Sequence, residues 1–411
     1  MAAADTLDIA AIRSQFPILE RKVHGDKPLI YLDSAATTPK PQAVIDTIDA
    51  HYASGTANVH RAAHELSVEA TEAYESARRR IGTFINATSS NEIIFTRSAT
   101  EAVNLVAQSW AATTLQAGDE ILVTEMEHHA NIVPWQLLRE RLGVTLKVIP
   151  MDDRGMLDMD ACRSLVTDRT KLVSATWISN ALGTVNPIES IISIAREAGA
   201  MTMVDATQAL PHRPVDVQAL GADFIVFSGH KMYGPTGIGC LWGRESILES
   251  MPPWQGGGDM IESVTFEKTT FNRLPWRFEA GTPHIAGAIG LGTAVDWLSE
   301  IGMPAIDARE TSLVATLAER LDAIPRVLLV GHPTPRAAAV SFMVDGMHPH
   351  DVGMMLDQHG VAVRTGHHCA QPTMQHFDVP ATVRASIGIF NDESDVDALD
   401  TALRRVIEVF G

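Results

Sequence analysis

Cysteine is scarce in this chain, whose 411 residues include only Cys162, Cys240 and Cys369. So few cysteines, with no Cys-x-x-Cys spacing, exclude a disulfide framework and argue against a structural zinc site built from cysteine pairs. Basic residues are also few, 32 against 50 acidic ones, which gives a formal net charge of −18. This balance favours solubility and argues against binding to nucleic acid.

Long hydrophobic runs are absent as well. No apolar stretch approaches the ~20 residues that a helix needs to span a bilayer, so we expect no membrane association. Residues 1–12 are rich in alanine but carry Asp5 and Asp8, and they lack the basic and long apolar regions of a signal peptide. We therefore expect a cytoplasmic protein in a reducing compartment.

The chain does contain a regular alternation of short apolar runs and amphipathic stretches. The runs are continuous in Val, Ile and Leu rather than alternating with polar residues, which is typical of strands buried on both faces of a mainly parallel sheet. They comprise residues 92–96, 120–124, 145–149, 171–178, 201–205, 224–228 and 239–243. After about residue 331 the pattern restarts with strands at 338–344 and 361–364 and helices at 349–359 and 395–410.

This pattern predicts an α/β fold. The length of 411 residues and the hydrophobic content of 45% predict a large core and more than one domain. We predict an N-terminal segment (1–25) that docks on the body, a large domain (26–298) and a smaller C-terminal α/β domain (299–411) that carries the Cys369 loop. A projecting hairpin is expected within residues 254–276. Further helices are predicted at residues 8–16, 102–111 (behind a capping box at 98–101), 188–199, 287–298 and 308–324.

The first candidate for chemistry is the segment Arg-Thr-Gly-His-His-Cys-Ala, residues 364–370. It places Cys369 directly after His367 and His368, five residues beyond Arg364. Nearby imidazolium groups and N–H dipoles stabilise a thiolate, so this loop predicts a reactive thiol. An incidental cysteine on a surface loop, or histidines that only shape the loop, are the alternatives. The other two cysteines fall in apolar or amphipathic stretches and are interpreted as core residues.

The second candidate is Lys231, in the segment Ser-Gly-His-Lys-Met-Tyr-Gly that follows a predicted buried strand. Open α/β sheets bind ligands at the carboxyl ends of their strands. A lysine desolvated there has a lowered pKa and can form a Schiff base with a carbonyl compound. Asp205 ends another buried strand and needs a cationic partner, because an unpaired buried carboxylate is costly.

Lys231 and Asp205 together predict pyridoxal phosphate as the cofactor. An aspartate paired with the protonated pyridine nitrogen strengthens the ring as an electron sink; a Lys–Asp ion pair without cofactor is the structural alternative. The phosphate needs N–H donors and hydroxyls at a helix N-terminus. The Ser-Ala-Thr-Glu turn supplies these, with Thr100 as the natural contact, and Ser228 and His230 are further candidates from the lysine loop.

With these motifs the chain resembles the cysteine desulfurases of the class V aminotransferase-like family, specifically the group II, SufS-type branch. The short loop at 364–370 is specific to group II, since group I members carry a longer, serine-rich loop. The resemblance covers essentially the whole chain and includes the segments 31–41, 58–61, 124–131, 179–185 and 278–283. It implies fold type I of the pyridoxal-phosphate enzymes and a homodimer.

The resemblance implies a role for each matching residue. Lys231 would hold the cofactor covalently, Asp205 would pair with the pyridine nitrogen, and Gln208 would hydrogen-bond the phenolic oxygen. The other implied contacts are His128 stacked on the ring face with a part in proton transfer, Asn180 near the ring oxygen and the substrate, Thr100, Ser228 and His230 at the phosphate, and Thr282 reaching the phosphate from the second subunit.

On the substrate side, the resemblance implies that Arg384 clamps the α-carboxylate, which suits a planar, bidentate guanidinium. Arg364 would lie close to the cysteine loop and the substrate, and His60 and Arg61 would approach the mouth of the site. The implied reaction converts L-cysteine to L-alanine. Cys369 would take the sulfur as a persulfide and pass it to an acceptor protein for iron–sulfur cluster assembly.

Three alternatives differ in class. A selenocysteine lyase of the same family uses the same parts. A transaminase is disfavoured, because it needs no persulfide carrier. A non-enzymatic metal-binding scaffold would leave Asp205, Lys231 and Arg384 without a role; its ligands would be His348, His350, His367, His368 and Cys369.

The segment His-Pro-His-Asp, residues 348–351, bears on the acceptor. Group II enzymes that work with a zinc-containing SufU-like acceptor resemble this chain here, whereas those paired with a SufE-like acceptor commonly differ before the aspartate. A histidine can ligate zinc, so His350 is predicted at the partner interface as a transient zinc ligand, without a resident metal. The alternative is a histidine near the N-cap of the following helix, with Asp351 favouring the helix dipole.

Overall fold

The computed structural model describes residues 7–410, and its largest element is a seven-stranded sheet of order β4-β10-β9-β8-β7-β5-β6. The pairs from β9 to β6 are parallel, while β10 runs antiparallel to both β9 and β4, so the predicted mainly parallel sheet is confirmed. The strands are β4 (Ile93–Thr96), β5 (Glu120–Thr124), β6 (Thr145–Ile149), β7 (Thr170–Thr176), β8 (Met201–Asp205), β9 (Phe224–Ser228) and β10 (Gly239–Gly243).

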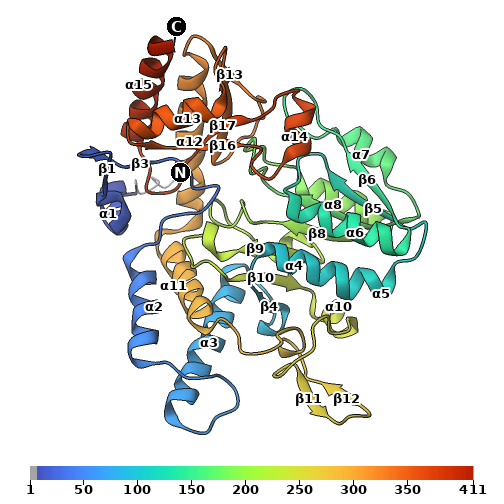
Figure 1. Ribbon diagram of the computed structural model, residues 1–411. Coiled ribbons are helices and arrows are strands. Elements are labelled where there is room, and N and C mark those ends of the chain that lie inside the picture. Colours follow the sequence, from blue (N-terminus) through green and yellow to red (C-terminus); the bar gives the residue numbers. More distant parts are fainter. Residues whose placement is uncertain (1–6, 411) are drawn as a thin grey trace, which may run out of the picture.

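The continuous apolar runs arise because helices cover both faces of this sheet (Figure 1). In β9, Ile225 and Phe227 face one buried cluster, and Phe224 and Val226 face the other. The first face is covered by α3 (Glu65–Phe84), α7 (Met159–Leu165), α8 (Ile188–Glu197) and α11 (Ile285–Ile301). The second is covered by α4 (Ala99–Val106), α6 (Val133–Leu142) and α10 (Glu245–Ser250).

A second sheet belongs to the C-terminal part, drawn in orange and red in Figure 1. Its order is β13-β14-β17-β16 and all its pairs are antiparallel. The strands are β13 (Val327–Leu329), β14 (Ala339–Val344), β16 (Arg364–Gly366) and β17 (Thr382–Ser386). With α12 (Met303–Asp322), α13 (Pro349–Gln358) and α15 (Glu393–Phe410) it encloses a separate apolar cluster. The predicted boundary between residues 298 and 299 falls inside α11, and the three-part division stays a prediction.

The predicted strand 361–364 is wrong as a single element. Residues of β15 (Val361–Ala362) pair in parallel with β3 (Ile30–Tyr31), whereas β16 begins at Arg364 and pairs with β17. Two short strands with different partners therefore replace one, and a continuous apolar run does not indicate this change of partner.

The N-terminal segment docks at the junction of the two parts. The helix α1 (Ile9–Arg13) is shorter than predicted, because Pro17 favours an extended conformation at the residue before it. Arg13 forms an ion pair of 2.7 Å with Asp395, and the Phe16 ring packs against Tyr233, Trp297 and Phe390 with centroids 5.9, 5.5 and 5.1 Å away.

The helix behind the predicted capping box begins three residues earlier than expected, at Ala99. Ser98 accepts from the Glu101 N–H at 3.4 Å, but the Glu101 carboxylate accepts from the N–H of Arg97 rather than of Ser98. The remaining elements are α2 (Gln42–Ser54), α5 (Ala112–Thr114), α9 (Val217–Leu220), α14 (Gln371–His376), β1 (Lys22–Val23), β2 (Lys27–Pro28), the π turn η3 (Ala107–Ala111) and the 3-10 turns η1 (Pro17–Glu20), η2 (Ser90–Glu92), η4 (His129–Asn131), η5 (Gly229–Lys231) and η6 (Trp276–Phe278).

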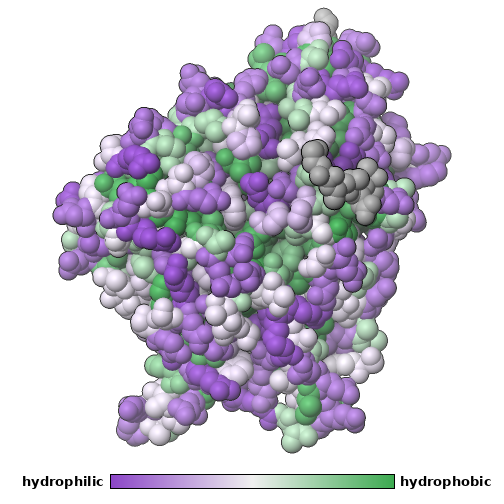
Figure 2. All heavy atoms as spheres, turned by 180° about the vertical axis from the view of Figure 1, so that it is seen from behind, coloured by the Kyte–Doolittle hydropathy of each residue, from purple (hydrophilic) through white to green (hydrophobic). Residues whose placement is uncertain are grey.

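The predicted hairpin consists of β11 (Ile261–Val264) and β12 (Thr269–Phe271) and projects from the body in Figure 1. Phe266 in its turn is fully exposed. Hydrophilic residues cover most of the face shown in Figure 2, with hydrophobic residues between them in smaller groups. No helix within residues 7–410 has both the length and the apolar character that crossing a membrane requires.

Candidate active site

A cavity of about 210 Å³ lies at the carboxyl ends of the central strands, where open α/β sheets bind ligands. The last residues of β7, β8 and β9 (Thr176, Asp205 and Ser228) all line it. The C-terminal part adds the cysteine loop. The structure brings most of the predicted site residues together around this cavity: Thr100, His128, Asn180, Asp205, Gln208, Ser228, His230, Lys231, Arg364, Cys369 and Arg384.

Lys231 lies on the 3-10 turn that follows β9. Burial, followed by the charge of Arg384, lowers the pKa of its amine to about 8. The turn is held from both sides by Thr38, whose hydroxyl donates to the His230 carbonyl at 3.2 Å and accepts from the Tyr233 N–H at 2.8 Å. A fixed amine with a lowered pKa is suited to nucleophilic and proton-transfer chemistry.

The floor of the cavity carries a buried carboxylate. Asp205 is 6% exposed and accepts the Thr207 N–H at 2.9 Å. Burial raises the pKa of Asp205, opposed by the Thr207 hydrogen bonds and by the charge of Lys231. Gln208 lies beside it, with its amide nitrogen donating to the Ala35 carbonyl at 2.8 Å. A cation or N–H donor placed here would therefore be bound favourably.

The start of α4 also lines the cavity. Ser98, Ala99 and Thr100 line the wall there, together with Ser228 and His230. The Ser228 hydroxyl accepts the Ala99 N–H at 2.8 Å, which joins the end of β9 to the helix N-terminus. Helix N-termini with nearby hydroxyls favour phosphate binding.

His128 lies on the segment after β5 and lines the cavity together with Lys231. Burial, and then the charge of Lys231, lowers its pKa to about 3, so the imidazole is neutral at pH 7. Its Nδ1 accepts the Ala130 N–H at 3.0 Å, which leaves the proton of the neutral ring on Nε2.

These features fit pyridoxal phosphate. The cavity offers an amine, a buried carboxylate that forms no ion pair among residues 7–410, and a helix N-terminus with nearby hydroxyls. For scale, an apolar cavity of about 150 Å³ holds a benzene molecule. Lys231, Asp205 and the Thr100–Ser228 end would hold its aldehyde carbon, ring nitrogen and phosphate respectively.

Two arginines form the side of the cavity nearest the C-terminal part. Arg384 is 1% exposed, and its guanidinium donates to the Asn180 carbonyl at 2.7 Å and to Asp33 at 3.3 Å. Burial lowers the pKa of Arg384 to about 10. Arg364 is exposed and lies 3.9 Å from the same carboxylate. Asp33 has no assigned role in the sequence prediction, although it lies in the segment 31–41.

Cys369 is exposed at the cavity on a turn with unusual backbone. His368 and Cys369 both have left-handed φ angles, 54° and 55°. The Asn180 amide donates to the His368 carbonyl at 2.6 Å, and the His368 Nε2 lies 2.7 Å from the Thr382 hydroxyl.

His368 is not the cationic partner of the thiol that the sequence allowed. Burial lowers its pKa to about 2, so the ring is neutral at pH 7 and cannot stabilise a thiolate by charge. Its hydrogen bond to Thr382 gives it the loop-shaping role instead. His367 is exposed. Cys162 and Cys240 are buried core residues as predicted, and burial raises the pKa of both thiols.

Thr282 does not line the lysine cavity of its own chain. It lines a second cavity of about 570 Å³ beside α3 and β4. His60 and Arg61 also lie on this side, where they pair with Glu75 at 2.8 Å and Asp259 at 2.6 Å. The expected contribution of Thr282 from a second subunit stays a prediction.

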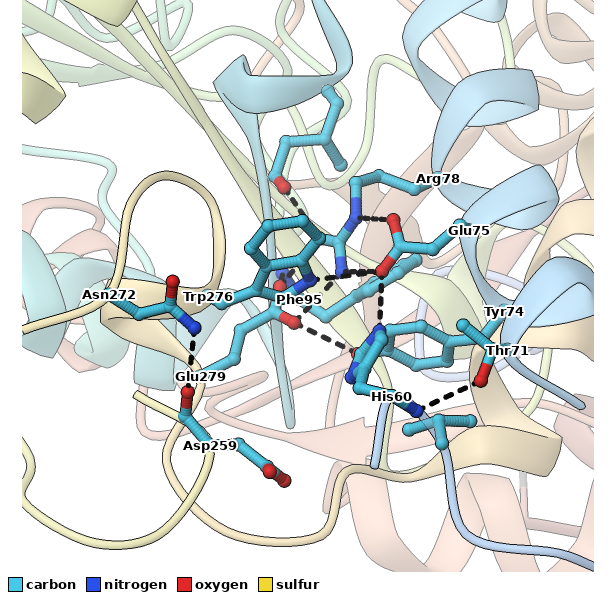
Figure 3. A network of polar contacts seen from close by, with 12 residues as sticks. His60, Thr71, Tyr74, Glu75, Arg78, Phe95, Asp259, Asn272, Trp276 and Glu279 are labelled. Atoms are coloured by element: carbon cyan, nitrogen blue, oxygen red, sulfur yellow. Dashed lines mark hydrogen bonds and ion pairs between the residues drawn. The ribbon is translucent and has the colours of Figure 1, made fainter. Parts of the chain in front are cut away.

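A buried polar network borders that second cavity (Figure 3). Glu279 accepts two hydrogen bonds from Arg78, at 2.6 and 2.9 Å, one from the Tyr74 hydroxyl at 3.0 Å and one from the Phe95 N–H at 2.7 Å. Phe95 belongs to the edge strand β4, so Glu279 ties the chain just before Thr282 to the edge of the sheet.

The histidines proposed for a metal-binding scaffold do not converge. His350 is exposed at the start of α13, and His348 caps that helix by accepting the His350 N–H at 3.2 Å. Within residues 7–410, no group of three or more His, Cys, Asp or Glu side chains is arranged to hold a metal ion.

Comparison with known proteins places this site in a family. The family model for aminotransferase class-V matches residues 30–399. The chain belongs to the class V aminotransferase family. It is 50% identical over 404 residues to proteins named cysteine desulfurase from Yersinia pestis and Yersinia pseudotuberculosis, covering 98% of this chain and 99% of theirs.

Solved structures agree. The cysteine desulfurase CsdA of Escherichia coli is 38% identical, with a TM-score of 0.91 over 98% of this chain and 100% of that one. A cysteine desulfurase of Thermococcus onnurineus is 38% identical, with a TM-score of 0.92 over 97% and 98% of the two chains. The predicted fold, enzyme class and cofactor are confirmed: the chain is a pyridoxal-phosphate enzyme of the cysteine desulfurase class.

Proposed function

We propose that this chain is a group II, SufS-type cysteine desulfurase that converts L-cysteine to L-alanine and carries the sulfur as a persulfide on Cys369. One observation carries the proposal: Lys231 lines a single cavity with Cys369 and Arg384, although it is far from both of them in sequence. A thiol in the same cavity as the lysine is what sulfur capture needs.

Arg384 would bind the substrate carboxylate. Its Nε is buried without a hydrogen-bond partner among the described residues, and Asp33 is the anion shared with Arg364. A carboxylate entering this corner would accept charge-assisted hydrogen bonds and reduce the repulsion between the two guanidinium groups.

Pyridoxal phosphate, when bound, supplies an electron sink conjugated with the substrate α-carbon. The Lys231 amine, with its lowered pKa, would take the α-proton and return a proton to the product. The Cys369 thiolate would form an S–S bond with the substrate sulfur while the C–S bond breaks. L-cysteine and the thiol become L-alanine and the persulfide, so no external oxidant is needed.

The remaining parts of the proposal rest on the resemblance. Thr282 would reach the phosphate of the second subunit in a homodimer, with His60 and Arg61 near its mouth. The persulfide would pass to a SufU-like rather than a SufE-like acceptor in the cytoplasm, for iron–sulfur cluster assembly. His350 would contact that acceptor, which its exposure at the start of α13 supports. We do not propose selenocysteine lyase, because the relatives are named cysteine desulfurases.

The test uses the purified enzyme loaded with pyridoxal phosphate. Adding L-cysteine should release alanine and place one persulfide on Cys369. Cys369→Ala should keep the visible cofactor band but form no persulfide, while the matched variant Cys162→Ala, which removes a buried core thiol, should behave as the parent. Persulfide formation in Cys369→Ala equal to that of the parent would overturn the proposal.

A further inference from the structure

The turn that carries Cys369 has a conformation that side chains disfavour. Left-handed φ values crowd the Cβ atom of any residue other than glycine, and here His368 and Cys369 adopt them in succession, at 54° and 55°. Such a turn persists only where its surroundings hold it in place. The contacts that hold it therefore determine where the thiol lies.

His129 contacts the chain at Cys369 itself and two residues after it. Its backbone N–H donates to the Cys369 carbonyl at 2.7 Å. Its Nε2 accepts the Gln371 N–H at 3.0 Å, across 242 positions of sequence. The two contacts hold the backbone just after the thiol to the large sheet, whereas the Thr382 contact of His368 holds the residue before it to the C-terminal sheet.

The second contact satisfies the start of a helix. Gln371 is the first residue of α14, and the first N–H groups of a helix need acceptors from outside it. The preceding residue, Ala370, has no side-chain acceptor, so the His129 ring provides from outside the helix an acceptor for the first N–H group of α14. Only a neutral imidazole can accept there, and burial, followed by His367, lowers the pKa of His129.

His129 is itself held rigidly. Two positions earlier, Glu127 is fully buried and accepts from the Thr124 hydroxyl at 2.7 Å, the Thr176 N–H at 2.8 Å and the Asn131 amide at 2.8 Å. These contacts fix the segment to the carboxyl ends of β5 and β7. The two consecutive histidines therefore have different contacts: His128 lines the cavity with Lys231, and His129 contacts the cysteine turn.

We propose that His129 is a positioning residue that holds Cys369 at the cavity by capping α14 in place of Ala370. It acts through the turn rather than on the reacting atoms. Sulfur transfer to Cys369 therefore depends on a hydrogen-bond acceptor in the side chain at position 129. The proposal rests on the proposed function, because it concerns the residue that would carry the persulfide.

The test compares His129→Ala with His129→Gln in the loaded enzyme. The single-turnover rate of Cys369 persulfide formation at saturating L-cysteine should fall roughly fivefold in His129→Ala, the factor that loss of one helix cap corresponds to. KM and the visible cofactor band should stay unchanged. His129→Gln should recover most of the rate, because the amide oxygen reaches the position of Nε2 and accepts the Gln371 N–H.

His332→Ala, which removes an exposed histidine far along the chain, is the matched control and should match the parent. Equal rates in parent and His129→Ala, or no recovery in His129→Gln, would overturn the proposal.

The failure of the proposed function would look different. A parent enzyme that forms no persulfide would overturn the proposed function. The positioning role of His129 is then measured without substrate, from the reactivity of the Cys369 thiol. The rate at which iodoacetamide alkylates Cys369 should rise in His129→Ala and should fall back to the rate of the parent in His129→Gln. An unchanged rate in His129→Ala would overturn the positioning role of His129. If His129→Ala folds poorly, persulfide formation and alkylation in His129→Gln still test the proposal, because both rates should be close to those of the parent.

Discussion

Arg364 and Arg384 lie directly opposite each other on the antiparallel strands β16 and β17. Like charges in that relation destabilise a sheet unless an anion offsets them. Asp33 supplies one carboxylate for the two guanidinium groups, at 3.9 and 3.3 Å. The corner beside the cavity therefore keeps an excess of positive charge, which favours a carboxylate-bearing substrate.

Arg384→Lys should raise KM for L-cysteine about tenfold or more with a smaller effect on kcat. Lysine keeps the charge but loses the planar pair of donors, and a hydrogen bond to a charged group contributes roughly 1.5–3 kcal/mol. Steady-state kinetics on the loaded enzyme measure this. Arg309→Lys, on the partly exposed pair with Glu393, is the control, and an unchanged KM in Arg384→Lys would remove the assigned carboxylate contact.

Neighbouring arginines on α3 offer a comparison between a buried and an exposed ion pair. Arg78 is fully buried against Glu279 (Figure 3), whereas Arg79 pairs with Glu72 at the surface. Glu279→Ala should lower the free energy of unfolding by about 3–5 kcal/mol, because it leaves a buried guanidinium short of its counter-charge. Glu72→Ala should change it hardly at all, because exposed pairs contribute little.

Urea unfolding of the two variants beside the parent measures the difference. Equal losses would show that Glu279 is as replaceable as Glu72, and the network would then have no part in holding the chain before Thr282.

The sequence was informative where a residue's environment is set locally. Continuous apolar runs predicted the strands of the large sheet, because strands covered on both faces have few polar positions. Lys231 and Asp205 were found because strand ends in such sheets are ligand sites. The cysteine loop was found from its own composition and from resemblance.

The contributions of Asp33 and His129 were not predictable, because each depends on partners far away in the chain. Asp33 meets Arg384 across 351 positions, and His129 meets Gln371 across 242. For His368, no sequence pattern indicates the burial that makes the ring neutral, so its loop-shaping role could not be predicted. The prediction of a single strand at 361–364 was wrong for the same reason, because β15 and β16 pair with different strands that are distant in sequence.

His350→Ala should leave the basal release of alanine unchanged and reduce only the stimulation by a zinc-containing SufU-like acceptor. The side chain is exposed and lies outside the cavity, so it has no route to the cofactor chemistry. Turnover with and without acceptor measures this, with His359→Ala at the other end of α13 as control. Equal stimulation of parent and variant would remove the interface role.

Stability should depend on pH through Glu127. Burial raises its pKa to about 7, so the folded state binds more protons than the unfolded state between about pH 4.5 and 7. The free energy of unfolding should therefore fall as pH rises through that window, by up to ~3 kcal/mol from this group.

Glu127→Gln should remove that slope, because an amide does not titrate. Urea unfolding at pH 5, 6, 7 and 8 on parent and variant separates this contribution from the remaining titrating groups, which both proteins share. The variant still offers an acceptor oxygen to the Thr124 hydroxyl and the Thr176 N–H, so it tests the charge rather than the packing. Parallel pH profiles would mean that Glu127 is ionised throughout, kept so by the hydrogen bonds that it accepts, and that burial is the weaker influence at this position.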